Sequence, residues 1–263
     1  NGDANMNLAG VAAGARAVRV ALGWMVVSCL MFAFVMVSIR LFLVDLPSEQ
    51  SVFLRYTIGA LMLLPLMGRA AGRVVTSPVR GLMAVRALLH GLAVYSWFFG
   101  VLRIPLAEVN AMLNLGPVYA TLGAVLFMGE KLRIRRIAAI LVSFIGALII
   151  IKPGFAEINL GTIAILITAP MFAGSDLIAK RLKAFENDRT IIFSLSAGIA
   201  AFMMVPAIGV WQPISATNWI GIMAISIAAT LGHITLMRSF SGPMWAAQTG
   251  KYMQLLFVVL FGI

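Results

Sequence analysis

The feature that most constrains this chain is a series of nine long apolar runs separated by short polar segments. Most of the runs have the ~20 residues that a helix needs to cross ~30 Å of hydrocarbon. No connection is long enough for a separate soluble domain, so we expect one integral membrane domain of the all-α, polytopic class. The predicted spans are residues 20–44, 51–67, 82–102, 106–128, 137–151, 160–179, 190–210, 219–237 and 244–263.

Composition and missing motifs argue against a soluble enzyme. Apolar residues make up 62% of the 263 residues and charged residues only 11%, whereas soluble domains have roughly 45–50% and 25%. The single cysteine, Cys29, excludes an intramolecular disulfide and a cysteine-based metal site. The ATP-binding P-loop and the common metalloprotease and serine-hydrolase signatures are also absent from the sequence. We therefore predict no enzymatic activity, no cofactor and no metal.

The net charge of +11 is interpreted as a signal of membrane orientation. If the N-terminus is cytoplasmic, fourteen cations lie in cytoplasmic segments and two, Arg103 and Lys152, lie outside. This asymmetry follows the positive-inside rule and needs no nucleic-acid partner. The cytoplasmic set is Arg16, Arg19, Arg69, Arg73, Arg80, Lys131, Arg133, Arg135, Arg136, Lys180, Arg181, Lys183, Arg189 and Arg238.

The two ends of the chain carry separate expectations. Residues 1–17 are rich in Gly and Ala and lack the pattern of a signal peptide, so we expect a flexible N-terminal tail. The last apolar run stops at Ile263 without a polar flank, so we expect a tenth helix that is missing from this sequence.

Two matches between the halves predict an internal repeat. At an offset of 140 residues, Met31-Phe32-Ala33 aligns with Met171-Phe172-Ala173, and Arg40 aligns with Lys180. At an offset of 135, residues 101–103 align with residues 236–238. We expect a five-helix unit used twice, over residues 18–154 and over 155–263 with its last helix missing. Because five is odd, the second copy would be inverted, as is typical of secondary transporters.

The motifs around the fourth and fifth runs resemble a known family. They read Leu106-Ala107-Glu108, Gly116-Pro117-Val118, Gly129-Glu130-Lys131-Leu132, Arg135-Arg136 and Lys152-Pro153-Gly154. This series is similar to the EamA-type repeat of the drug/metabolite transporter superfamily. The resemblance implies ten helices in two inverted sets of five, with a central cavity lined by helices 1, 3, 4, 6, 8 and 9.

Ionisable residues within the spans are the first candidates for function, because a charge in hydrocarbon costs at least a few kcal/mol unless it faces protein or water. Glu108 near the outer side could pair with Arg40 or Arg55 as a gate or a proton-accepting group; a static ion pair or an interfacial anchor is the alternative. Asp176 and Lys251 are the corresponding inner candidates for mutual pairing. The alternative for Asp176 is that it simply belongs to the polar inner end of its span.

Three further faces follow from helical spacing. Arg86, His90 and Trp97 share a stripe that should face protein or a wet cavity. His90 and His233 could relay protons, although hydrogen bonding to a neighbouring helix is the commoner role of such histidines. Asn110, Asn114 and Pro117 put two amides and a kink on one face that could contact a polar ligand or pack helices. Trp245, Gln248 and Tyr252, with Lys251 beside them, form another aromatic and polar face, in which Trp245 could instead be an interfacial belt residue.

We therefore expect a bacterial inner-membrane transporter or facilitator of small polar metabolites, amino-acid-like or organic anions, working by alternating access and more consistent with export than with import. Proton coupling and a homodimer, through the small-residue stripe Ala139, Ser143 and Ala147, are additional hypotheses. The alternative is a non-transporting membrane scaffold with the same fold in a larger complex.

Overall fold

The protein is described here by a computed structural model that covers residues 2–129, 159–242 and 244–261, with four single positions at 138, 141, 142 and 145. Every regular element in the described part is a helix. The elements are α1 (Gly2–Phe42), α2 (Ser48–Met67), the short 3₁₀ helix η1 (Gly68–Gly72), α3 (Arg73–Thr76), α4 (Arg80–Val101), α5 (Leu106–Leu113), α6 (Gly116–Met128), α8 (Leu160–Leu182), α9 (Asp188–Gly209), α10 (Ala216–Ser239), α11 (Met244–Gly250) and α12 (Met253–Leu260).

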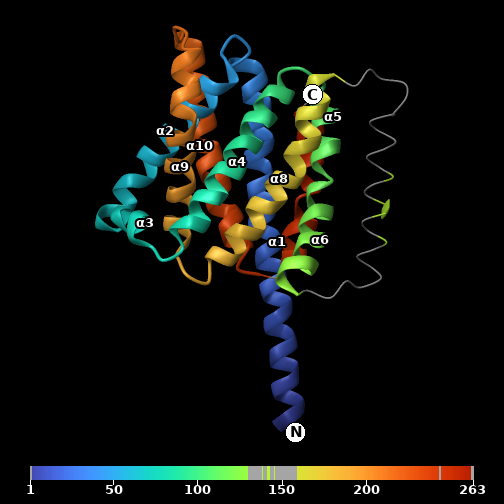
Figure 1. Cartoon of the computed structure of the whole chain (residues 1–263). Coiled ribbons are helices and arrows are strands. Elements are labelled where there is room, and N and C mark those ends of the chain that lie inside the picture. The colour runs from blue at the N-terminus through green and yellow to red at the C-terminus, as the bar shows by residue number, and fades with distance from the viewer. Residues whose placement is uncertain are drawn as a thin grey trace.

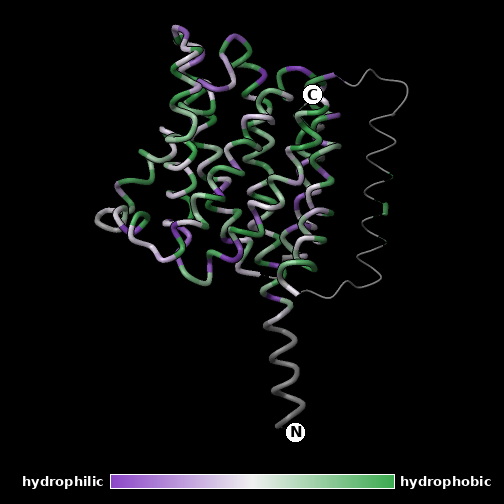
Figure 2. The backbone as a smooth tube through the Cα atoms, viewed as in Figure 1, coloured by the Kyte–Doolittle hydropathy of each residue, from purple (hydrophilic) through white to green (hydrophobic). Residues whose placement is uncertain are grey.

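The prediction of an all-α membrane protein is confirmed. Within the described residues, seven helical segments of 20 to 29 residues are long and apolar enough to cross a membrane. In the most apolar 18-residue stretch of each segment, between 39% and 67% of the residues are buried inside the protein. Many of the exposed positions are Leu, Ile, Val or Phe. Such a surface suits lipid. Hydropathy colouring shows mostly apolar helix bodies with hydrophilic residues gathered at the connections (Figure 2).

Polar side chains cap the starts of three helices. The side-chain oxygens of Asn159 and Asn187 accept hydrogen bonds from the backbone N–H groups of Thr162 and Thr190, at 3.1 and 2.9 Å, and so cap α8 and α9. Ser215 caps α10 within a capping box. These caps satisfy N–H groups that a helix leaves without partners in its first turn. The helix starts are therefore encoded locally.

The structure differs from the sequence-based expectation at the N-terminus. Residues 1–17 were expected to form a flexible tail, but α1 begins at Gly2 and continues without interruption to Phe42. Alanine is the strongest helix former and recurs through this segment, which contains no proline. Figure 1 shows the start of α1 extending away from the helix bundle.

Two of the predicted spans are interrupted. The run 106–128 forms α5 and α6 with a turn at Asn114 and Leu115, and the run 244–263 forms α11 and α12 with a turn at Lys251 and Tyr252. The predicted span 137–151, its stripe of Ala139, Ser143 and Ala147, and the motif residues 130–136 and 152–154 lie outside the described residues.

The helices pack in a characteristic set of pairs. α1 contacts α10 most extensively, α4 contacts α8, and α2 contacts α9 (Figure 1). The connections that follow α2, α8 and α10 lie at the end of the bundle where the N-terminal part of α1 emerges. The connections that follow α1, α4 and α9 lie at the opposite end. Helices distant in sequence thus surround one central region.

Candidate functional site

A cavity of about 120 Å³ occupies this central region. Its walls come from α1, α2, α4, α8 and α10 and from the two interrupted segments, α5–α6 and α11–α12. A volume of this size exceeds the roughly 10–15 Å³ needed for one water molecule several-fold. Seven of the predicted site residues line it: His90, Trp97, Asn110, Asn114, Asp176, His233 and Lys251.

The predicted pairing of Asp176 with Lys251 is confirmed. The Lys251 ammonium donates to Oδ2 of Asp176, joining α8 to the turn between α11 and α12. The Asp176 side chain is almost fully buried, whereas that of Lys251 keeps 24% of its surface exposed. Cys29 on α1 contacts the same turn, with its thiol 3.5 Å from the Gly250 carbonyl oxygen. The charge pair therefore connects a continuous helix to an interrupted one.

Two histidines meet within a group of aromatic rings. The ring centroids of His90 and His233 are 5.4 Å apart, and Phe172 and Phe32 lie 5.0 Å from His90 and 5.1 Å from His233, respectively. Nδ1 of His90 is 2.9 Å from the Ser175 hydroxyl on α8. His90 thus has the helix-to-helix hydrogen bond that is common for such residues. The described residues contain no group of three or more side chains suited to a metal ion.

Three buried polar atoms of the cavity wall lack a hydrogen-bond partner among the described residues. They are Nε1 of Trp97, Nδ2 of Asn110 and Nδ1 of His233. Each residue is at most 7% exposed. A buried polar group without a partner costs about 1–3 kcal/mol. A polar ligand or water in the cavity would relieve that cost.

Arg86 and Glu108 do not line the cavity. Arg86 is buried behind it and donates to the carbonyl oxygens of Ser175 and Ile191, at 3.3 and 3.2 Å, so it joins α4 to α8 and α9. Glu108 is partly buried, and its expected ion pair with Arg40 or Arg55 is not formed in the described part of the chain. Arg40 binds a backbone carbonyl group instead, and the role of Glu108 as a proton-accepting group or an interfacial anchor stays a prediction.

Gln248 and Tyr252 also lie outside the cavity wall. Gln248 is 3% exposed on α11, and Tyr252 is partly buried in the turn before α12. Their neighbour Lys251 is the member of this predicted face that reaches the cavity.

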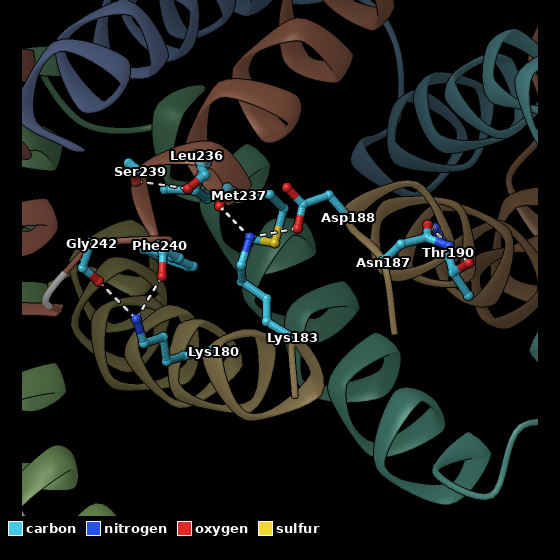
Figure 3. A network of polar contacts seen from close by, with 10 residues as sticks. All are labelled: Lys180, Lys183, Asn187, Asp188, Thr190, Leu236, Met237, Ser239, Phe240 and Gly242. Atoms are coloured by element: carbon cyan, nitrogen blue, oxygen red, sulfur yellow. Dashed lines mark hydrogen bonds and ion pairs between the residues drawn. The ribbon is translucent and has the colours of Figure 1, made fainter. Parts of the chain in front are cut away.

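Arg40 holds the connection that leads into α5. Its guanidinium donates to the Ile104 carbonyl oxygen at 2.8 Å, just before Pro105. Lys180, near the end of α8, does the same before α11, where its ammonium lies 2.6 Å from the Phe240 carbonyl oxygen and 2.7 Å from that of Gly242 (Figure 3). Both cations therefore hold a connection that precedes an interrupted helix.

Lys183 adds a second bond at the same end of the bundle. Its ammonium lies 2.5 Å from Oδ1 of Asp188 and 2.9 Å from the Met237 carbonyl oxygen (Figure 3). The end of α8, the start of α9 and the end of α10 are thereby joined.

Sequence reasoning missed part of the cavity wall. Tyr56, Phe32 and Phe172 line it, but their residue types are common on any apolar helix, so the sequence carries no signal for them. Arg55 does carry a signal, as a charge inside a span, but it is not among the predicted binding residues. The structure places Arg55 in the cavity wall.

Comparison with known sequences identifies the family. The model of the EamA-like transporter family matches residues 19–152, about half of the chain. The chain belongs to the EamA-like transporter family. The resemblance inferred from the motifs is thus confirmed, and EamA-family membership makes this chain a membrane transporter of small molecules and not an enzyme.

Curated relatives of this EamA-family chain are transporters with different substrates. The pseudopaline exporter CntI of Pseudomonas aeruginosa is 28% identical over 201 residues, which cover 74% of this chain and 69% of the relative. A riboflavin transporter of Vibrio cholerae is 26% identical over 226 residues, covering 83% and 75%. An S-adenosylmethionine uptake transporter of Rickettsia bellii is 25% identical over 162 residues, covering 62% and 55%.

A solved crystal structure shares the fold of this EamA-family chain. It superimposes with a TM-score of 0.68 at 17% identity, covering 94% of this chain and 88% of the other. This match supports the arrangement of the helices.

Proposed function

We propose that this EamA-family protein is a secondary transporter or facilitator that exports small polar metabolites, amino-acid-like or organic anions, by alternating access. The observation that carries the proposal is the central cavity, in which a buried charge pair and three unpartnered polar atoms face a largely apolar, aromatic wall. Ligand sites commonly combine an apolar lining with a few placed polar groups.

We infer that the chain contains two inverted copies of a five-helix unit, with residues 18–154 forming one copy and residues 155–263 forming four helices of the other. Paired contacts support this inference: α1 packs on α10 as α8 packs on α4, so the first helix of each unit contacts the third helix of the other. Arg40 and Lys180, which align in sequence, make matching bonds to the connections before α5 and α11. The interruptions also fall at corresponding places, as is expected at a transporter's binding site.

The proposed location is the bacterial inner membrane with the N-terminus in the cytoplasm. The connections at the N-terminal end of the bundle carry most of the described basic residues outside the spans, including Arg73, Lys183 and Arg189, whereas the opposite connections contain Arg103. Positive residues are retained on the cytoplasmic side.

Transport is tested with the purified chain in liposomes and a panel of radiolabelled amino acids and organic acids. We expect saturable flux of at least one solute, reduced by Trp97→Phe, which removes a polar donor from the cavity wall. The matched control, Trp219→Phe, changes an exposed tryptophan at the start of α10 and should leave flux unchanged. No flux across the panel would favour the scaffold alternative.

Proton coupling through Glu108 or Asp176 is a separate proposal. Asp176 supports it by position, because its carboxylate lines the cavity. A transport rate that stays the same when the proton gradient is collapsed would reject coupling and leave facilitated transport in place.

A further inference from the structure

Arg55 on α2 is a buried cation whose charge no carboxylate neutralises in the described part of the chain. It is 6% exposed and lines the cavity. Its guanidinium carbon lies 3.7 Å from the centre of the Tyr56 ring. An unpaired charge in a low-dielectric interior is costly, so its retention needs a physical reason.

Two other cations in or behind the cavity wall, Arg86 and Lys251, already have partners. Arg86 donates to two backbone carbonyl groups, and Lys251 binds Asp176. Among the described wall residues, Arg55 and Lys251 contribute two positive charges and Asp176 one negative charge. The cavity therefore has an excess positive charge, which is located on Arg55.

The contact with Tyr56 leaves the guanidinium suited to a planar anion. A guanidinium carries five N–H donors in a planar fork, so a carboxylate can accept two of them while the tyrosine ring stays in contact with the group. The unpartnered N–H groups of Trp97 and Asn110 line the same cavity and are also donors. These donors favour a ligand that offers acceptor atoms.

We propose that Arg55 binds the carboxylate of the transported solute, with Tyr56 holding the guanidinium in place. This inference rests on the proposed transport function and narrows it to solutes that carry a carboxylate. Asp176 stays paired with Lys251 on another part of the wall, so an ammonium group on the solute is not required.

The proposal is tested by binding to the detergent-solubilised protein, with two pairs of probes that differ in charge and little in shape: lactate and lactamide, and 3-phenylpropionate and 3-phenylpropionamide. For at least one pair we expect the wild-type protein to bind the carboxylate about 10- to 100-fold more tightly than the amide, the range for a charged hydrogen-bonded contact. Arg55→Met should abolish this preference, and Arg55→Lys, which keeps the charge without the planar fork, should retain part of it.

Melting temperature separates binding from a purely structural role. Because no carboxylate among the described residues neutralises Arg55, Arg55→Met should keep or raise the melting temperature of the ligand-free protein. A large decrease, a preference that survives Arg55→Met, or no carboxylate binding at millimolar probe would overturn the proposal. If the wild-type protein shows the preference but transports none of the panel, the transport function fails and the Arg55 site stands.

Discussion

At the scale of single residues, the cations in and behind the cavity wall have distinct partners. Lys251 has a carboxylate, Arg86 has carbonyl oxygens, and Arg55 has an aromatic ring. These differences follow from position, since all three are cations in apolar segments of the chain. Removing the charge of Lys251 should therefore lower the stability of the protein, whereas removing the charge of Arg55 should not.

Asp176→Asn should destabilise the protein by about 3 kcal/mol, because it leaves the Lys251 ammonium without its carboxylate. The expected loss is near the low end of the range for buried pairs, since Lys251 keeps 24% of its side-chain surface exposed. Lys251→Met should cost a similar amount, and the double variant should recover much of the loss. The measurement is a double-mutant cycle of unfolding free energies in detergent. Strictly additive losses would show that the pair is not coupled.

At the scale of helices, close approach between neighbours depends on small residues. Gly198 on α9 faces α4, where an added Cβ atom would lie 2.6 Å from Cβ of Ala87. Neither atom can rotate away, so the two helices would have to separate. Membrane helices without a strong hydrophobic driving force rely on such close packing.

Gly198→Ala should therefore lower the free energy of unfolding by about 1–3 kcal/mol, the usual cost of overpacking. The control is Gly23→Ala on α1, where an added Cβ atom meets nothing within 4 Å. It should be neutral, or stabilising by up to ~1 kcal/mol, since alanine favours a helix over glycine. Both variants are compared by melting in the same detergent. Equal effects at the two sites would contradict the packing argument.

At the scale of the whole molecule, the proposed orientation places the two ends of the bundle in different compartments. Ala184 lies exposed in the basic connection after α8, and Ala216 lies exposed at the start of α10 at the opposite end. The chain has a single cysteine, Cys29, which is buried. Introduced cysteines at these two positions can therefore report sidedness.

In a Cys29→Ala background, a membrane-impermeant maleimide added to intact cells from the periplasmic side should label Ala216→Cys and not Ala184→Cys. Opening the membrane should make both positions reactive, which controls for local accessibility. Labelling of Ala184→Cys alone in intact cells would indicate the opposite orientation. Labelling of both in intact cells would contradict the placement of the two positions on opposite sides of the membrane.

The sequence by itself determined the class of fold and the approximate limits of the helices. Runs of about 20 apolar residues must form helices in lipid, because each backbone polar group needs a partner within its own segment. The same reasoning correctly selected Asp176 and Lys251 as a pair, since a charge within a span requires a partner or water. It did not predict the helical start of α1 at Gly2, because composition alone does not separate an alanine-rich helix from a flexible tail.

Only the tertiary structure decided which of the polar residues meet. Asp176 and Lys251 are 75 residues apart, and Arg40 reaches a carbonyl group 64 residues away instead of Glu108. Such contacts depend on how helices rotate and approach one another, which apolar periodicity specifies weakly when lipid and protein are both apolar. For the same reason, the absence of an acidic partner for Arg55 in the described chain became visible only after its neighbours were placed around the cavity.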